Sequence, residues 1–196
     1  MNIRRIAWAI TKTAASLGFV WIAWRAGTLH AGIPGAWVGV GLVLSVVGDV
    51  CLLSHARRPF LVGLGAFLLA HVAFVASFLA LGVRGTAAAL AAVPFGTIAA
   101  VTWWWLAPHT GSMRTPVLAY VLVITVMVCC AVGAAAAAPG RGGMLLAAVL
   151  FFLSDLTVAR DRFVAPGLAN RLIGLPLYYA AQVLFAVTTA IAVAQG

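Results

Sequence analysis

The sequence is poor in charged residues, and acidic residues are the scarcest of them. Lysine, arginine, aspartate and glutamate make up 8% of the 196 residues, and only three carboxylate side chains are present. Soluble domains carry about 25% charged residues, so the composition excludes a soluble enzyme or binding domain. Hydrophobic residues reach 65%, which indicates an integral membrane protein.

Cysteine is also scarce, and its positions exclude a disulfide framework. Cys51, Cys129 and Cys130 all fall in apolar segments, and an odd buried set gives neither paired bridges nor a zinc spacing. The sequence has no HxxxH or HExxH motif, no glycine-rich phosphate loop and no nucleophile elbow. We expect no metal and no cofactor, although one His with two Asp remains an alternative zinc set.

Long hydrophobic runs fill most of the chain. Because about 20 apolar residues cross a bilayer, the sequence predicts an all-α, polytopic transmembrane bundle of about seven helices in a single domain, residues 1–196. The predicted spans are residues 6–24, 35–54, 60–82, 86–106, 115–137, 143–158 and 170–194. Pro94 falls inside the fourth span. A kink is expected there, because each half alone is too short to cross.

The positive charge is spread over short loops, although the net charge is +9. Such scatter argues against a nucleic-acid partner, which would need a basic stripe or face. Eight arginines fall on the side of the N-terminus (4, 5, 57, 58, 114, 160, 162 and 171) and three on the other (25, 84 and 141). This bias predicts a cytoplasmic N-terminus, and arginine and alanine abundance suits a bacterial inner-membrane protein.

Two of the three carboxylates, Asp49 and Asp155, lie inside predicted helices. An ionisable side chain at membrane depth is costly, so it indicates a functional site. Both helices run toward the N-terminal face, and Asp49 and Asp155 lie five and three residues before the predicted helix ends. Gly48 and Ser154 precede the two acids, which allows close helix approach. The alternative is a structural ion pair with Lys12 or an arginine.

Further polar residues fall in the same half of the predicted bundle. At roughly 1.5 Å per residue, they lie about one to three helical turns from the N-terminal face: Lys12, His71, Tyr120, Tyr178, Tyr179 and Gln182. Asn170 and Arg171 start the last helix and suit a phosphate or lipid head group. Lys12 can instead snorkel to the interface, His71 can bond a helix carbonyl, and the tyrosines can simply pack. Asp161 is expected to form a surface ion pair between its flanking arginines.

Five short segments recur in the order and spacing of a known family: GDVCLL, RRPFLVGLGAFLLAHVAFVASF, PVLAYVLVITVM, AVLFFLSDLTVARDRF and LYYAAQVLFA. Through them the chain resembles the YhhN family of integral membrane proteins, bacterial relatives of lysoplasmalogenase. Family members usually have eight helices and carry the lysine in the second, whereas the Lys12 segment comes first here. The chain is therefore expected to be one helix short at its N-terminus, either because the start site is truncated or because this branch lacks the first helix. Thr13 stands where the family usually has a proline.

The resemblance implies an alkenyl ether hydrolase that cleaves the vinyl ether of a lysoplasmalogen. The products would be a fatty aldehyde and glycerophospho-ethanolamine or glycerophospho-choline. An oxocarbenium intermediate suits two carboxyl groups in different environments, as in glycosidases. Burial disfavours the charged form, so we expect Asp155 to be the acid and Asp49, paired with Lys12, the base.

The remaining polar residues are expected to bind this lysophospholipid. His71, Tyr120 and Gln182 would position water and glycerol, with Tyr178, Tyr179 and Asn170 as further contacts. The head group would lie toward Arg57, Arg58 and Arg171, and the alkenyl chain among the membrane helices.

Two other functions remain open at the level of sequence. A small lipid or proton-coupled transporter would use the buried acids to carry protons. GDVCLL before RRPF and SDLTVA before RDRF hint at the internal repeat that such proteins often show. A structural membrane protein would use the acids only to hold helices together. Neither the oligomeric state nor the head-group preference follows from the sequence.

Overall fold

A computed structural model describes residues 3–54 and 56–195, which form seven long helices. They are α1 (Ile3–Arg25), α2 (Gly32–Cys51), α3 (Arg57–Leu81), α4 (Gly85–Leu106), α5 (Arg114–Ala137), α6 (Gly142–Ala159) and α7 (Leu168–Ala194). Each of the seven is long and apolar enough to cross a membrane, which confirms the predicted transmembrane bundle. Two arginines used to predict the orientation, Arg4 and Arg5, lie outside the side chains described.

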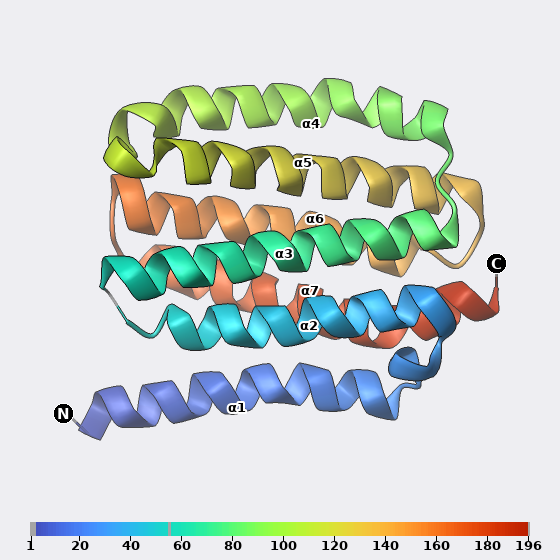
Figure 1. Ribbon diagram of the computed structural model, residues 1–196, viewed down its shortest axis with the longest axis horizontal. Coiled ribbons are helices and arrows are strands. Elements are labelled where there is room, and N and C mark those ends of the chain that lie inside the picture. Colours follow the sequence, from blue (N-terminus) through green and yellow to red (C-terminus); the bar gives the residue numbers. More distant parts are fainter. Residues whose placement is uncertain (1–2, 55, 196) are drawn as a thin grey trace.

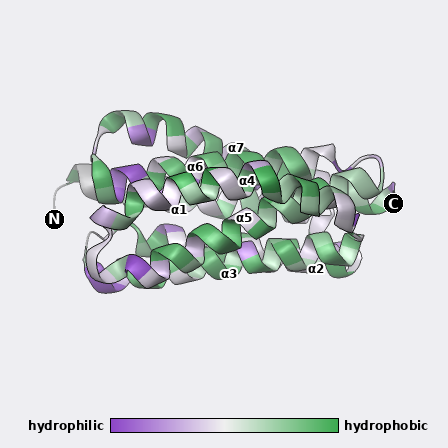
Figure 2. Ribbon diagram, turned by 90° about the horizontal axis from the view of Figure 1, so that it is seen from above, coloured by the Kyte–Doolittle hydropathy of each residue, from purple (hydrophilic) through white to green (hydrophobic). Residues whose placement is uncertain are grey.

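The helices lie side by side and alternate in direction, so the two termini are at opposite ends of the bundle (Figure 1). Helices α1 and α4 form the two edges, while the closest packing is within the pairs α2–α3 and α6–α7. Hydrophobic residues cover the length of the bundle, and hydrophilic residues gather mainly at the end that holds the N-terminus (Figure 2). We call this end the N-terminal end.

Small residues beside the two buried acids allow the close packing of each helix pair. A Cβ atom on Gly48 in α2 would lie 2.5 Å from the ring of Phe67 in α3. In the other pair, Ser154 Oγ donates a hydrogen bond of 3.1 Å to the carbonyl oxygen of Gly174. A larger residue at either position would push the helices apart, in line with the role expected for Gly48 and Ser154.

Aromatic rings form the centre of the core. Phe74 and Phe185 stack with ring centroids 4.2 Å apart, and Phe151 packs against Phe74 at 6.1 Å. The same Phe151 contacts Tyr178 at 5.5 Å and His71 at 4.4 Å. Edge and offset contacts of this kind stabilise the packing beyond the burial of area. They also fix the rings of two predicted site residues.

The turn between α2 and α3 differs from the prediction. Helix α2 ends at Cys51 rather than at residue 54, so Asp49 lies two residues before the end instead of five. Helix α3 begins at Arg57, and Pro59, which was expected to mark the break, lies in its first turn. Proline fits there because first-turn N–H groups have no helical partner.

One other loop was predicted inaccurately, and a second contains a buried arginine. The segment after α6 was predicted to be a loop from residue 160, but Arg160–Val164 continue as a π-helical turn closed by a 2.9 Å bond from Ala165 N–H to the Arg160 carbonyl. Arg141 is not a solvated loop cation. It is buried and donates to the carbonyl oxygen of Gly82 at 3.0 Å, because the end of α3 leaves that carbonyl without a helical donor. Pro94 lies within continuous α4, as expected.

Candidate active site

A cavity of about 690 Å³ lies in the N-terminal half of the bundle, and residues from all seven helices line it. The site residues predicted from sequence that line the cavity are Lys12, Asp49, Tyr120, Asp155, Asn170 and Tyr178. The other three, His71, Tyr179 and Gln182, are not among the lining residues. The two buried acids therefore face one shared space.

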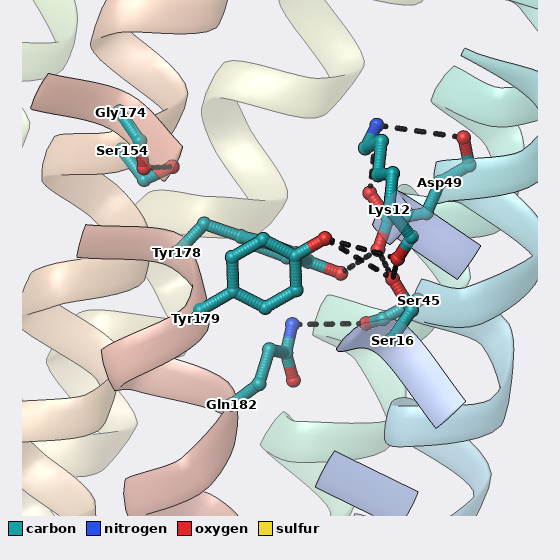
Figure 3. A network of polar contacts seen from close by, with 9 residues as sticks. All are labelled: Lys12, Ser16, Ser45, Asp49, Ser154, Gly174, Tyr178, Tyr179 and Gln182. Carbon is teal, nitrogen blue, oxygen red and sulfur yellow. Dashed lines mark hydrogen bonds and ion pairs between the residues drawn. The ribbon is translucent and has the colours of Figure 1, made fainter. Parts of the chain in front are cut away.

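Asp49 is surrounded by groups that stabilise a carboxylate. Lys12 Nζ lies 3.0 Å from Oδ1, while Ser16 Oγ and the phenol of Tyr178 donate to Oδ2 at 2.7 and 2.6 Å. Figure 3 shows these donors converging from α1 and α7 on the acid of α2. The Lys12 side chain is 11% exposed and that of Asp49 is 4% exposed. Lys12 is thus a largely buried counter-ion of Asp49 rather than a snorkelling lysine.

Asp155 has a different environment. The phenol of Tyr120 donates to its Oδ2 at 2.6 Å, and His71 Nε2 lies 3.5 Å from the same oxygen. Among the ion pairs of residues 3–54 and 56–195, none joins Asp155 to a lysine or an arginine. The Asp155 side chain is only 15% exposed, so little water can take the place of the missing cation.

A neutral His71 does not supply the missing cation either. Its Nδ1 lies 2.6 Å from the carbonyl oxygen of Phe67, which can only accept, so Nδ1 carries the hydrogen. In a neutral ring Nε2 then presents a lone pair toward Asp155. No described group bonds this nitrogen, because 3.5 Å is too long for a hydrogen bond. Two lone pairs repel, so the contact becomes favourable when the pair shares one proton.

Tyr179 and Gln182 do not line the cavity, but they connect the helices that surround it. The phenol of Tyr179 donates to the carbonyl oxygen of Lys12 at 3.2 Å. Gln182 lies one turn deeper than Tyr178 and its Nε2 donates to Ser45 Oγ at 3.1 Å (Figure 3). These bonds tie α7 to α1 and α2, and so fix the helices that carry Lys12 and Asp49.

Asn170 ties together the turn between α6 and α7. Its Nδ2 donates to Asp161 Oδ1 at 3.1 Å and to the Ala165 carbonyl at 2.8 Å, while its Oδ1 accepts from Arg160 at 2.6 Å. Asp161 pairs with Arg171 at 3.8 Å and not with the arginines on either side of it. The turn thereby places Asp161, Arg162 and Arg171 at the cavity.

The basic residues of the α2–α3 turn lie elsewhere. Arg57 and Arg58 are not among the residues that line the cavity. Arg57 instead donates to Ser112 Oγ at 2.9 Å, across to the segment before α5. Of the arginines expected near a head group, only Arg171 lines the cavity, and Arg162 joins it.

Sequence reasoning missed two serines of the site. Ser16 donates to Asp49, and Ser45 accepts from Gln182. Their spacing carries a usable signal, since Ser16 follows Lys12 by four residues and Ser45 precedes Asp49 by four. Residues four apart share a helix face. Ser16 therefore faces the same neighbouring helices as Lys12, and Ser45 faces the same ones as Asp49.

The arrangement suits proton transfer. One carboxyl group has a lysine partner and two hydroxyl donors, the other has no lysine or arginine partner, and both line the same cavity. In the part of the chain that the structure describes, no three His, Cys, Asp or Glu side chains are close enough to hold a metal ion.

Known proteins resemble this chain over most of its length. The sequence profile of the YhhN family matches residues 7–189. A protein named lysoplasmalogenase from Mycobacterium bovis is 33% identical over 159 residues, which cover 76% of this chain and 58% of the relative. Lysoplasmalogenase TMEM86B from Homo sapiens is 32% identical over 167 residues, covering 85% of this chain and 67% of the relative.

The bovine protein Lysoplasmalogenase TMEM86A is 33% identical over 157 residues, which cover 76% of this chain and 63% of that protein. The matches thus span about three fifths of the mycobacterial and bovine relatives. No solved structure matches the chain significantly. From the profile match and the seven apolar helices, we conclude that the chain belongs to the YhhN family of multi-pass membrane proteins.

Proposed function

We propose that the protein is a lysoplasmalogenase, which hydrolyses the vinyl ether bond of a lysophospholipid by acid-base catalysis with Asp155 and Asp49. The observation that carries the proposal is that both acids line one cavity in opposite environments. The names of the relatives agree with this chemistry. In the proposed orientation the N-terminal end faces the cytoplasm and the bundle spans the inner membrane, so the substrate comes from the membrane lipids.

In the first step protonated Asp155 gives its proton to the β-carbon of the vinyl ether. The carbon–carbon double bond supplies the electron pair, and the α-carbon and the ether oxygen share the resulting positive charge as an oxocarbenium ion. Tyr120 holds the acid through a hydrogen bond to Oδ2, and His71 Nε2 lies 3.5 Å from the same oxygen. The carboxylate of Asp49 stabilises the cation across the cavity, as acidic groups do for the similar cation of glycosidases.

In the second step water attacks the α-carbon and Asp49 takes its proton, which gives a hemiacetal. Collapse of the hemiacetal breaks the carbon–oxygen bond to glycerol and releases the aldehyde, with the hydroxyl proton passing to the glycerol oxygen. Asp49 finishes protonated and Asp155 ionised. Transfer of one proton from Asp49 to Asp155, through water in the cavity, restores the starting state. The overall reaction consumes one water molecule.

The cavity also suits the shape of the substrate. Many of its lining residues are apolar, including Leu64, Ile124, Phe152 and Leu175, whereas the charged residues lie at Lys12, the two acids and the α6–α7 turn. An alkenyl chain would pack against the apolar walls, and the polar head would remain near the N-terminal end. The same division of apolar walls and few polar groups is typical of small-molecule sites.

The test is aldehyde release by purified, folded protein in detergent, with Asp155→Asn and Asp49→Asn compared with wild type. Asn keeps an oxygen that can accept from Tyr120 or Tyr178 but cannot exchange a proton, so both variants should lose at least about 100-fold in kcat. Wild-type rates in both variants would exclude the acid-base scheme. Turnover without any membrane gradient would also separate hydrolysis from transport.

A further inference from the structure

The π-helical turn after α6 carries two oppositely charged side chains that catalysis does not use. Asp161 and Arg162 are neighbours in this turn, and both line the cavity. From Asp155 to Asp161 the chain advances about 9 Å along the helix axis at 1.5 Å per residue. That separation fits an extended glycerophosphate backbone between the proposed site of bond cleavage and the head group.

Arg162 is an oriented cation without an acidic partner. Its guanidinium carbon lies over the Phe60 ring, 4.1 Å from the ring centre, in a cation–π contact. Among the ion pairs of residues 3–54 and 56–195, none includes Arg162. A guanidinium in this state has donors free for a phosphate, which it binds through two parallel bonds.

Asp161 offers one free carboxylate oxygen. Oδ1 accepts from Gly167 N–H at 2.9 Å and from Asn170 Nδ2 at 3.1 Å, so the side chain is held in place. Oδ2 has only the 3.8 Å contact with Arg171, whose side chain is 54% exposed. Exposed pairs at such distances contribute little. An ammonium group can therefore replace Arg171 at Oδ2 at small cost.

We infer that Asp161 and Arg162 form a head-group site for a zwitterionic phosphodiester, with Arg162 on the phosphate and Asp161 on the ammonium of ethanolamine or choline. The inference rests on the proposed function for the placement of the lipid. A phosphate monoester without an amine would bring a second negative charge next to the Asp161 carboxylate, which would repel it. The site therefore adds a head-group specificity that the family name does not state. The site would favour zwitterionic lysophospholipids over anionic ones.

Binding of non-cleavable ligands tests the site separately from catalysis. The probes are 1-O-alkyl lysophospholipids with a saturated ether, bearing ethanolamine, choline or a bare phosphate, and the matching alkylglycerol. Arg162→Gln should weaken all three phospholipids by about 10-fold or more and leave alkylglycerol unchanged. Asp161→Asn should weaken the ethanolamine and choline lipids by a similar factor but not the bare phosphate. Asn keeps the Oδ1 acceptor, so the turn should remain folded.

Arg58→Gln is the matched control, because it removes the same charge at an exposed position of the N-terminal end outside the cavity. The site is wrong if Arg162→Gln weakens binding no more than this control, or if Asp161→Asn weakens all phospholipids equally. Glycerophospho-ethanolamine, as a soluble competitor, should bind far more weakly than the lipid. Equal affinity would assign the site to a soluble phosphodiester and overturn the lipid assignment. Normal binding without hydrolysis of alkenyl lipids would instead reject the proposed function alone.

Discussion

Tyr178 on α7 donates a hydrogen bond of 2.6 Å to the carboxylate of Asp49 on α2, so the helix pair α6–α7 holds the acid of the pair α2–α3. The reverse relationship also exists, since His71 on α3 faces Asp155 on α6 at 3.5 Å. His71 follows Asp49 by 22 residues, and Tyr178 follows Asp155 by 23. Each helix pair thus supplies one acid and one ring that positions the acid of the other pair.

Tyr178→Phe should therefore impair the site although the ring is kept. The substitution removes a hydrogen bond to a charged acceptor, worth about 1.5–3 kcal/mol, while the ring still packs against Phe19, Phe67 and Phe151. We expect slower aldehyde release and a lower melting temperature in detergent. Tyr179→Phe is the control, because its hydroxyl contacts only Ser16 and the Lys12 carbonyl. Equal effects of the two substitutions would contradict a special role for Tyr178.

The sequence predicted the helices well because their signal is local. All seven spans were found within three residues of their observed ends, since hydropathy over about 20 residues depends little on tertiary contacts. The errors occur where a turn decides the boundary. Pro59 lies in the first turn of a helix instead of breaking one, and Arg160–Val164 continue α6 as a π turn. Both choices depend on backbone bonding that composition does not show.

The depth of the site was predictable, but its pairings were not. Alternating helix direction places Lys12, Asp49 and Asp155 in one half of the bundle. Only the packing of α1 against α2 and α7 decides that Lys12 pairs with Asp49 rather than with Asp155. For His71, one nitrogen bonds a helix carbonyl, as one of the two interpretations predicted, and the other faces an acid. A single sequence shows which residues share one face of a helix, but not how that helix is rotated against its neighbours.

Lys12→Met should destabilise the protein strongly. It would leave the carboxylate of Asp49 buried without its counter-ion, and breaking such a pair costs about 3–5 kcal/mol. We expect a clear fall in melting temperature and in activity. Arg58→Met, which removes a positive charge from an exposed position at the same end, should change both very little. If the two variants melt alike and Lys12→Met stays active, the buried ion pair is incorrect.

His71 should respond differently to its two amide substitutions. Asn can reproduce the Nδ1 bond to the Phe67 carbonyl but places nothing near Asp155, whereas the longer Gln can place its amide where Nε2 lies. We expect His71→Asn to lower kcat by about 100-fold, the size of effect typical of proton-transfer partners, and His71→Gln to retain more activity. Melting temperatures measured beside the rates separate this effect from lost packing. Equal rates at equal stability would show that Nε2 has no role.

Gly48→Ala tests the close approach of α2 and α3 beside Asp49. The new methyl group would lie 2.5 Å from the ring of Phe67, which packs edge-on against Phe151 and Tyr178 and cannot move freely. Overpacking of this kind costs about 1–3 kcal/mol, and movement of Phe67 would also shift the carbonyl that holds His71. We expect a lower melting temperature and slower aldehyde release.

Gly65→Ala in α3 is the matched control, because a Cβ atom there would meet nothing within 4 Å. Alanine is favoured over glycine inside a helix by about 1 kcal/mol, so this variant should be unchanged or more stable and fully active. The contrast between the two glycines separates helix propensity from packing, since both changes add one methyl group to a helix. Equal stability of the two variants would mean that α2 and α3 do not approach closely at Gly48, and the positions assigned to Asp49 and His71 would then be wrong as well.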